Sequence, residues 1–195
     1  MVRPALAGAA LLLLLNLLAF TAAIYHRFAE QRLDALPDER AARAAAFASS
    51  FAPWSATHAA LHGWIEAEAG NLAATEAAYR KALRTAAADP VLWAEYALAL
   101  TRNGVFDERL AVATRRALEL APSSPAVRHS VSRMALSYWR FGSAELRELW
   151  QQTLRWDLDH NRDAFLRDIA QAGWRTAFCA QHAATLGEEA WCSKP

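Results

Sequence analysis

The stretch that decides the fold is GNLAATEAAYRKAL, residues 70–83, because a second copy follows as GVFDERLAVATRRAL, residues 104–118. The two opening glycines, Gly70 and Gly104, lie 34 residues apart. Each copy begins at a turn, ends in Ala-Leu and is followed by a proline. A fixed period of this length is typical of stacked helix pairs, in which each pair buries its apolar face against the next. The sequence therefore predicts a helical-repeat fold.

The repeat resembles the tetratricopeptide family at several positions of that family's motif. Trp93 occupies the large aromatic position of the first helix in the second copy. In the first copy, Gly63 is the small residue of the first helix and Tyr79 the aromatic residue of the second. The first copy departs from the pattern at Ala59, where Trp is expected, and at Thr75, where a small Ala is expected. The resemblance implies a solenoid of antiparallel helix pairs.

An uncharged run of 20 residues, ALAGAALLLLLNLLAFTAAI, occupies residues 5–24. At about 1.5 Å of rise per residue, a helix of this length matches the roughly 30 Å hydrocarbon core of a bilayer. We expect residues 1–25 to form a single transmembrane anchor that contacts the lipid bilayer through residues 5–24. A cleaved signal peptide that starts at the charged Arg3 is the alternative. The expected fold class is all-α: an N-terminal single transmembrane helix, a tetratricopeptide-like antiparallel helix-pair solenoid and a C-terminal helical cap.

Three further segments are expected after the anchor. Residues 26–52 are polar and alanine-rich and predict a helical stalk, whereas residues 53–125 hold the two repeats. Residues 126–195 keep helical spacing without a clean repeat and predict a C-terminal cap of the kind that closes a solenoid. Within this cap we expect two short helices over residues 163–172 and 174–186. Few Gly and Pro residues interrupt the chain, and we expect no sheet.

The two cysteines, Cys179 and Cys192, are the only ones in the chain. An even, locally spaced pair favours a disulfide in an oxidising compartment. The arginines point to the opposite side of a membrane, because more of them follow the apolar run than precede it and the positive-inside rule keeps such a domain in the cytoplasm. We give the cysteines more weight and expect a single-pass protein of the bacterial inner membrane, with its C-terminal domain in the periplasm.

The search for catalytic motifs finds neither a phosphate-binding glycine loop nor a G-x-S-x-G nucleophile motif. Cys179 and His182 share a helix face, so a thiol or metal enzyme remains an alternative, although a disulfide beside a surface histidine explains them more simply. His58 and His62 stand four residues apart without a third ligand, and we expect them to be packing or solvated histidines. The net charge of +1 excludes a general attraction to nucleic acid. We therefore expect no enzyme and no nucleic-acid partner.

An acidic string, DLDHNRD at residues 157–163, has the spacing of oxygen ligands in a calcium loop. The candidate ligands are Asp157, Asp159, Asn161 and Asp168. Arg162, however, stands where such a loop needs glycine, and acidic residues near a helix start explain the string more simply. We expect no cofactor, with calcium as the alternative.

The expected function is a non-catalytic scaffold that binds or assembles partner proteins. A Trp-led helix, a proline after an apolar AL-x-L, a Trp-containing helix and a late Arg-then-Cys stretch occur in this order. In that order they resemble small membrane-anchored tetratricopeptide proteins associated with bacterial exopolysaccharide production, a resemblance that covers about half of the chain. This resemblance implies partners in a membrane or periplasmic assembly. The alternative is an accessory factor for a periplasmic enzyme system, in cytochrome c assembly or in methanol dehydrogenase activation with calcium loading.

The repeat assignment also predicts which residues contact a partner. First-helix positions line the inner groove of such a solenoid, and a large aromatic side chain there is a suitable anchor for a bound peptide. The predicted partner-binding residues are Trp64, Thr57, Ala60, Ala67, Val91, Ala94, Leu98 and Thr101.

Overall fold

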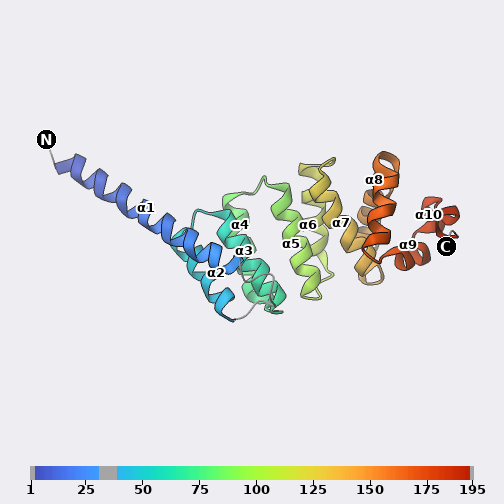
Figure 1. Cartoon of the computed structure of the whole chain (residues 1–195), viewed down its shortest axis with the longest axis horizontal. Coiled ribbons are helices and arrows are strands. Elements are labelled where there is room, and N and C mark those ends of the chain that lie inside the picture. The colour runs from blue at the N-terminus through green and yellow to red at the C-terminus, as the bar shows by residue number, and fades with distance from the viewer. Residues whose placement is uncertain (1–2, 31–38, 194–195) are drawn as a thin grey trace. The chain divides into compact units, whose positions relative to one another are not determined.

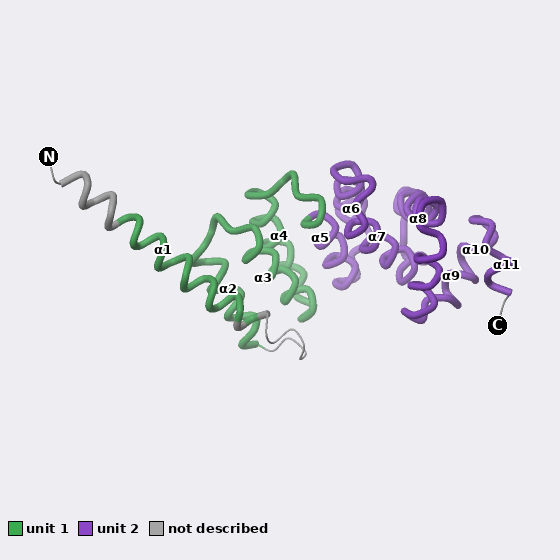
Figure 2. The backbone as a smooth tube through the Cα atoms, turned by 45° about the horizontal axis from the view of Figure 1, so that its top comes forward, with its two compact units in different colours: residues 1–92 green, residues 93–195 purple. Residues whose placement is uncertain are grey.

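The computed structural model describes residues 3–30 and 39–193, without the side chains of residues 3–10, 28 and 30. The described residues form helices and no strand (Figure 1). The chain divides into two compact units, residues 1–92 and 93–195 (Figure 2). Successive helices joined by short turns are consistent with a helical-repeat solenoid.

Unit 1 contains α1 (Arg3–Glu30), α2 (Glu39–Phe51), α3 (Ala56–Glu68) and α4 (Leu72–Thr85), and it includes the start of α5 (Pro90–Arg102). Helix α1 packs against α2 and α3, and α3 packs against α4. Small side chains allow these helices to approach closely. The core that joins α1, α2 and α3 consists of Ala29, Ala41, Ala44, Ala45 and Ile65.

The two repeat turns have the same backbone structure. Gly70 and Gly104 follow α3 and α5 with φ of 72° and 71°, a left-handed conformation that glycine adopts without steric penalty. In each turn the residue after the glycine donates its N–H to the carbonyl five residues earlier, Asn71 to Glu66 at 2.9 Å and Val105 to Leu100 at 3.0 Å. This hydrogen bond closes the end of a helix. The 34-residue period thus corresponds to one repeated helix-ending turn.

Unit 2 continues with α6 (Glu108–Leu120), α7 (Pro125–Tyr138), a 3-10 turn η1 (Trp139–Phe141) and the long α8 (Ala144–Gln171). Three short helices complete it: α9 (Arg175–Gln181), α10 (Ala183–Leu186) and α11 (Glu189–Cys192). Helix α8 packs against α6, α7 and α9. Its Trp150 is fully buried, and Gly142 leaves room for the indole ring, since a Cβ there would lie 2.5 Å from Trp150 Cζ3. The helix predicted over residues 163–172 corresponds to the part of α8 that follows the non-helical residue Asn161, and it ends at Gln171.

The predicted transmembrane helix is wrong. In the part of the chain that the structure describes, none of the helices combines the length and apolarity that crossing a bilayer requires. The apolar residues of α1 with described side chains run from Leu11 to Ile24, about 21 Å at 1.5 Å per residue, which is shorter than the roughly 30 Å hydrocarbon core. Side chains of residues 5–10, which belong to the predicted span, lie outside the described set.

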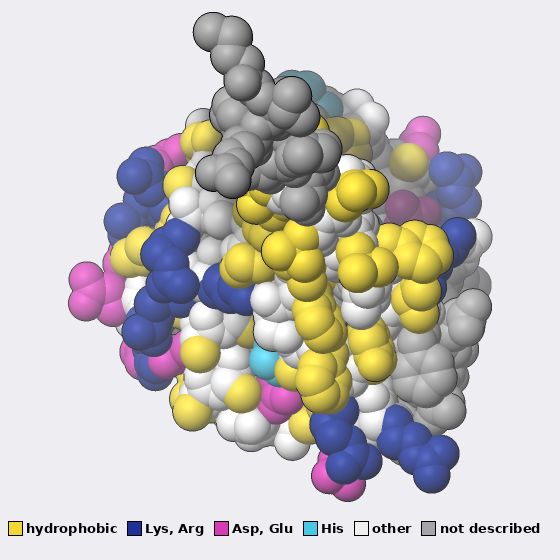
Figure 3. Space-filling view, turned by 90° about the vertical axis from the view of Figure 1, so that its left-hand side faces the viewer, with side chains coloured by type: hydrophobic (Ala, Val, Ile, Leu, Met, Phe, Trp, Pro, Cys, Tyr) yellow, Lys and Arg dark blue, Asp and Glu magenta, His cyan; other side chains and the backbone are white. Residues whose placement is uncertain are grey.

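Helix α1 also takes part in packing within unit 1. Its Ala22 and Ala29 are fully buried, and Tyr25 stacks on Phe47 of α2 with ring centroids 5.6 Å apart. Leucines of α1 such as Leu13 remain exposed, and Figure 3 shows a strip of apolar side chains on the end of the chain from which α1 projects. The prediction of a single-pass protein of the bacterial inner membrane with a periplasmic domain is corrected by the same finding, whereas bilayer contact through residues 5–24 stays a prediction.

Candidate functional site

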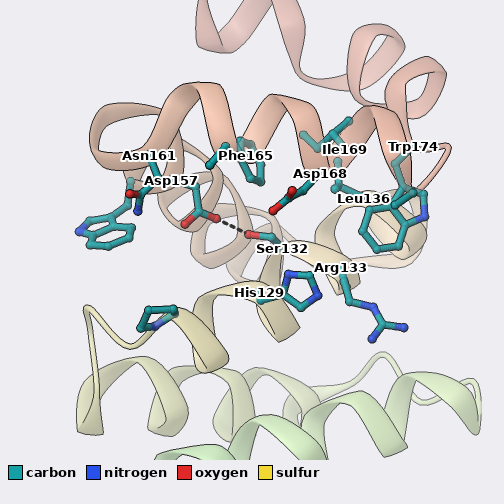
Figure 4. A pocket seen from close by; sticks show the side chains of 14 residues that line it. His129, Ser132, Arg133, Leu136, Asp157, Asn161, Phe165, Asp168, Ile169 and Trp174 are labelled. Carbon is teal, nitrogen blue, oxygen red and sulfur yellow. Dashed lines mark hydrogen bonds between the residues drawn. The ribbon is translucent and has the colours of Figure 1, made fainter.

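Helix α8 bends at Asn161, where φ of −142° and ψ of 34° lie outside the helical range. No proline or glycine occurs between residues 157 and 166, so the bend is not imposed by either of these residue types. The bend separates a first segment of α8, which ends at residue 160, from a second segment that starts at residue 162. In Figure 4 the second segment runs across the face of α7, and space for a cavity opens between them.

The cavity between α7 and α8 has a volume of about 620 Å³, which lies within the roughly 300–1,000 Å³ range of ligand pockets. Its α7 wall carries positions spaced by three and four residues, as expected for one helix face. Its α8 wall includes residues on both sides of the bend, and Trp174 follows α8. The lining residues are Pro125, His129, Ser132, Arg133, Leu136, Trp156, Asp157, Asn161, Ala164, Phe165, Asp168, Ile169, Ala172 and Trp174.

Asp157 is a buried carboxylate on the wall of the cavity, with 8% of its surface exposed. The hydroxyl of Ser132 on α7 donates a hydrogen bond to its Oδ2 at 2.6 Å (Figure 4). Among the described residues, no cation forms an ion pair with it. Burial raises the pKa of Asp157, and Ser132 and the positive field of Arg128 oppose this shift only in part. Asp157 therefore couples α7 to α8 through one hydrogen bond and keeps a second oxygen for another donor.

Two arginines near the cavity are held against tryptophan rings. The guanidinium carbon of Arg128 lies 4.5 Å from the ring centre of Trp156, and its Nε donates to the carbonyl oxygen of Pro122 at 2.6 Å. The guanidinium carbon of Arg133 lies 5.9 Å from the ring centre of Trp174. Figure 4 shows the Arg133 guanidinium pointing away from the cavity. Each arginine therefore packs against a tryptophan ring that lines the cavity, Trp156 or Trp174.

Three of the four predicted calcium ligands line this cavity: Asp157, Asn161 and Asp168. They are not arranged as a calcium loop, because residues 157–168 belong to α8 instead of forming an extended loop. Asp159, the fourth candidate, is exposed and outside the lining. Within the described residues, no group of three or more His, Cys, Asp or Glu side chains could hold a metal ion. The spacing that suggested a calcium loop instead places polar groups on one side of a bent helix.

Cys179 of α9 and Cys192 of α11 form the predicted disulfide, with Cα atoms 5.6 Å apart. Both cysteines are therefore bonded, and Cys179 offers no thiolate in this structure. His182 is 2% exposed, and burial lowers the pKa of its imidazole to about 4. Its ring meets that of Trp139 edge-on at 4.5 Å. The predicted surface histidine is thus a packing residue, and the Cys179 and His182 pair does not form an activated nucleophile.

An ion pair also fixes this end of unit 2. Glu188, which is 6% exposed, accepts two hydrogen bonds from the guanidinium of Arg162, at 2.9 and 2.6 Å. Arg162 is the residue in the glycine position of the calcium pattern, and it lies directly after the bend at Asn161. The two hydrogen bonds therefore join the second segment of α8 to the residue that precedes α11.

The predicted partner-binding residues of the repeats lie in both compact units. Thr57, Trp64 and Val91 keep partly or fully exposed side chains, whereas Ala60 and Leu98 are 9% and 8% exposed. Ala67, Ala94 and Thr101 are at most 2% exposed and contribute to helix packing. Direct contact with a partner through these residues therefore depends mainly on Trp64, Thr57 and Val91.

The two histidines with metal-like spacing have separate contacts. The ring of His58 stacks on that of His26 with centroids 4.7 Å apart. The Nε2 atom of His62 lies 3.3 Å from a carboxylate oxygen of Glu66. Burial lowers the pKa of His62, and the charge of Glu66 opposes this shift. These contacts agree with packing histidines in unit 1.

Several lining residues had no role in the sequence analysis, among them His129, Ser132, Arg133, Phe165 and Trp174. Helical spacing offered a signal for Phe165 alone: it stands at i+8 from Asp157, on the face of a straight helix that also carries Asn161 and Asp168. The facing positions of α7 could not be found in this way, because spacing within one helix does not reveal which helix packs against it.

Comparison of the chain with protein-family models, with curated proteins and with solved structures finds no match. The assignment of a function consequently rests on the residues of the chain and on their geometry.

Proposed function

We propose that the chain is a non-catalytic helical-repeat scaffold that binds a segment of a partner protein in the cavity between α7 and α8. The observation that carries this proposal is the composition of the cavity. Apolar side chains of Leu136, Phe165 and Ile169 line it beside polar groups from both helices. Binding pockets commonly combine apolar walls with a few polar groups that orient the ligand.

The chemistry of the cavity favours binding over catalysis. Nucleophilic catalysis needs a nucleophile, a base within hydrogen-bond reach of it and a third group that orients the base. Among the described lining residues, Ser132 is the hydroxyl side chain; it donates a hydrogen bond to the carboxylate of Asp157, which no third side chain among the described residues orients. That carboxylate is buried, and the disulfide engages both cysteines elsewhere in unit 2. The setting suggested by the sequence resemblance, exopolysaccharide assembly, belongs to the proposal as a source of candidate partners.

The proposal is tested by filling the cavity without removing a contact. Ala164 is an exposed alanine on the second segment of α8 and lines the cavity. Ala164→Phe places a ring in the binding space. Ala170→Phe is the matched control, because Ala170 is an exposed alanine of the same helix that is not part of the lining.

The measurement is quantitative crosslinking and affinity capture of the tagged full chain from the cells that produce it. We expect at least one protein to be captured by the wild type and by Ala170→Phe, and to be lost with Ala164→Phe. Retention of every captured protein by Ala164→Phe would contradict the cavity as the binding site.

A further inference from the structure

Two carboxylates face the cavity between α7 and α8 from different parts of α8. Asp157 precedes the bend at Asn161, and Asp168 follows it. Figure 4 shows both carboxylates directed into the cavity, with Asp168 on the second segment of α8. The side chain of Asp168 is exposed and makes no hydrogen bond or ion pair among the described residues. An occupant therefore meets acceptor oxygens on two sides.

The positive groups around the cavity do not neutralise these carboxylates. Arg128 is stacked on Trp156 and donates to a backbone carbonyl, and Arg133 points away from the cavity toward Trp174. Apart from His129, the ionisable side chains of the lining are two carboxylates and one guanidinium. A cationic group on the occupant would complement this distribution, whereas an anionic group would be repelled by it.

The hydrogen bond from Ser132 affects whether a lysine ammonium group or an arginine guanidinium group binds Asp157 better. Oδ2 of Asp157 already accepts the hydroxyl proton of Ser132 at 2.6 Å. A guanidinium binds a carboxylate best through two parallel hydrogen bonds, which need both oxygens. An ammonium group is a compact donor that can bind a carboxylate through one acceptor oxygen. The geometry of Asp157 thus favours lysine over arginine.

The remaining lining residues suit the apolar part of a peptide. Leu136 and Ile169 are 3% and 1% exposed, and Phe165 is partly exposed beside them. The methylene chain of lysine and a neighbouring apolar side chain can both lie against such a surface. The cavity is also larger than a single side chain needs, so residues next to the lysine enter it as well.

We propose that the cavity recognises a lysine-bearing, otherwise apolar segment of a partner protein, with the lysine ammonium group attracted by the carboxylates of Asp157 and Asp168. This inference rests on the proposed function, because it names the chemistry of the segment that the scaffold binds. The carboxylates then select a segment with a positive charge, and the apolar residues contribute affinity for its apolar side chains.

The test is fluorescence anisotropy with the full chain and two labelled peptides. The first peptide is Ser-Leu-Lys-Leu-Ser, and the second has norleucine in place of lysine, which keeps the methylene chain and removes the charge. We expect the lysine peptide to bind the wild type about tenfold more tightly than the norleucine peptide, the scale of one hydrogen-bonded charge. Asp168→Asn should remove this difference.

The matched control is Asp159→Asn, which removes an exposed carboxylate from the same helix outside the cavity and should keep the tenfold preference. Equal binding of the two peptides by the wild type, or equal loss in Asp159→Asn and Asp168→Asn, would overturn the inference and leave the proposed function standing. Full displacement of the lysine peptide by micromolar n-butylamine would also overturn it, in favour of a small free amine.

Binding of neither peptide would equally overturn the inference. The capture experiment with Ala164→Phe would then test the proposed function independently. A partner lost with Ala164→Phe would support the cavity as a site of different specificity, whereas retention of all partners would remove the site itself.

Discussion

Replacement of Gly63 by alanine tests the packing that defines the first repeat. Gly63 lies on α3 against the fully buried ring of Tyr79 on α4. A Cβ at position 63 would lie 2.7 Å from Tyr79 Cδ2, 2.8 Å from Tyr79 Cε2 and 3.3 Å from the Cβ of Ala78. Carbon atoms pack at about 3.5–4.0 Å, so the ring must move by close to 1 Å. The buried surroundings of Tyr79 restrict that movement.

Two opposing effects set the size of the change. Alanine in a helix interior is more stable than glycine by about 0.5–1 kcal/mol. Overpacking a close-packed core costs about 1–3 kcal/mol. We therefore expect Gly63→Ala to lower the free energy of unfolding by about 1 to 2 kcal/mol, although glycine is the poorer helix former.

The assay is urea unfolding of the full chain followed by circular dichroism, for the wild type, Gly63→Ala, Tyr79→Leu and the double variant. Leucine removes the ring atoms that meet the new methyl group. The effect of Gly63→Ala should therefore be smaller in the Tyr79→Leu background, and the two single effects should not add. Unchanged or increased stability of Gly63→Ala, or full additivity, would refute the close approach of α3 and α4.

The remaining predictions concern unit 2. Burial raises the pKa of Asp157, so the folded protein loses stability as the pH rises from the pKa of the unfolded state to that of the folded state. In urea unfolding, Asp157→Asn should therefore raise the free energy of unfolding by about 1 kcal/mol at pH 7 and leave it unchanged near pH 3. A variant that is less stable than the wild type at pH 7 would contradict this. Burial lowers the pKa of His182 from 6.5 to about 4, so the free energy of unfolding should fall by up to about 3 kcal/mol as the pH decreases from 6.5 to 4. The fall should be smaller in His182→Leu. Equal pH dependence of the free energy of unfolding in the wild type and the variant would contradict burial of a neutral imidazole. Reduction of the Cys179–Cys192 disulfide, whose cysteines are 13 residues apart, should lower the free energy of unfolding by about 3 kcal/mol, whereas unchanged unfolding with reductant would show that α9 and α11 are held by other contacts.

Local signals in the sequence anticipated the helical repeat well. Gly70 and Gly104 mark helix-ending turns because each adopts a left-handed backbone conformation. The need for glycine can be recognised from the single residue at each turn, without knowledge of the tertiary packing. The small residue Gly63 and the aromatic Tyr79 were assigned to the first and second helix of the repeat, and their side-chain positions meet in the structure. The cysteine pair was equally local, and its disulfide is present.

Features that depend on packing were not anticipated. The apolar run of α1 has the composition of a membrane span, yet the later part of the helix buries Ala22 and Ala29 against the rest of unit 1. Hydropathy measures the average of a segment and does not reveal which side chains a neighbouring helix covers. Composition alone therefore led to the wrong fold class for the N-terminal segment.

The candidate site also depends on packing that the sequence pattern does not reveal. The string from Asp157 to Asp168 was compared with a calcium loop, although acidic residues near a helix start were the simpler explanation. The structure keeps it helical and bends it at Asn161, where neither proline nor glycine announces a break. Ser132 of α7 and Phe165 of α8 line one cavity because the two helices pack together, and spacing within one helix does not reveal which helix packs against it.

Hydrogen exchange of the full chain with and without a captured partner tests the central claim most directly. The account predicts slower exchange of backbone amides in residues 125–138 of α7 and 156–174 of α8 and the following turn when the partner is bound. The same segments of Ala164→Phe should show no change. Protection confined to other helices, or protection of these segments that persists in Ala164→Phe, would contradict the α7 and α8 cavity as the binding site.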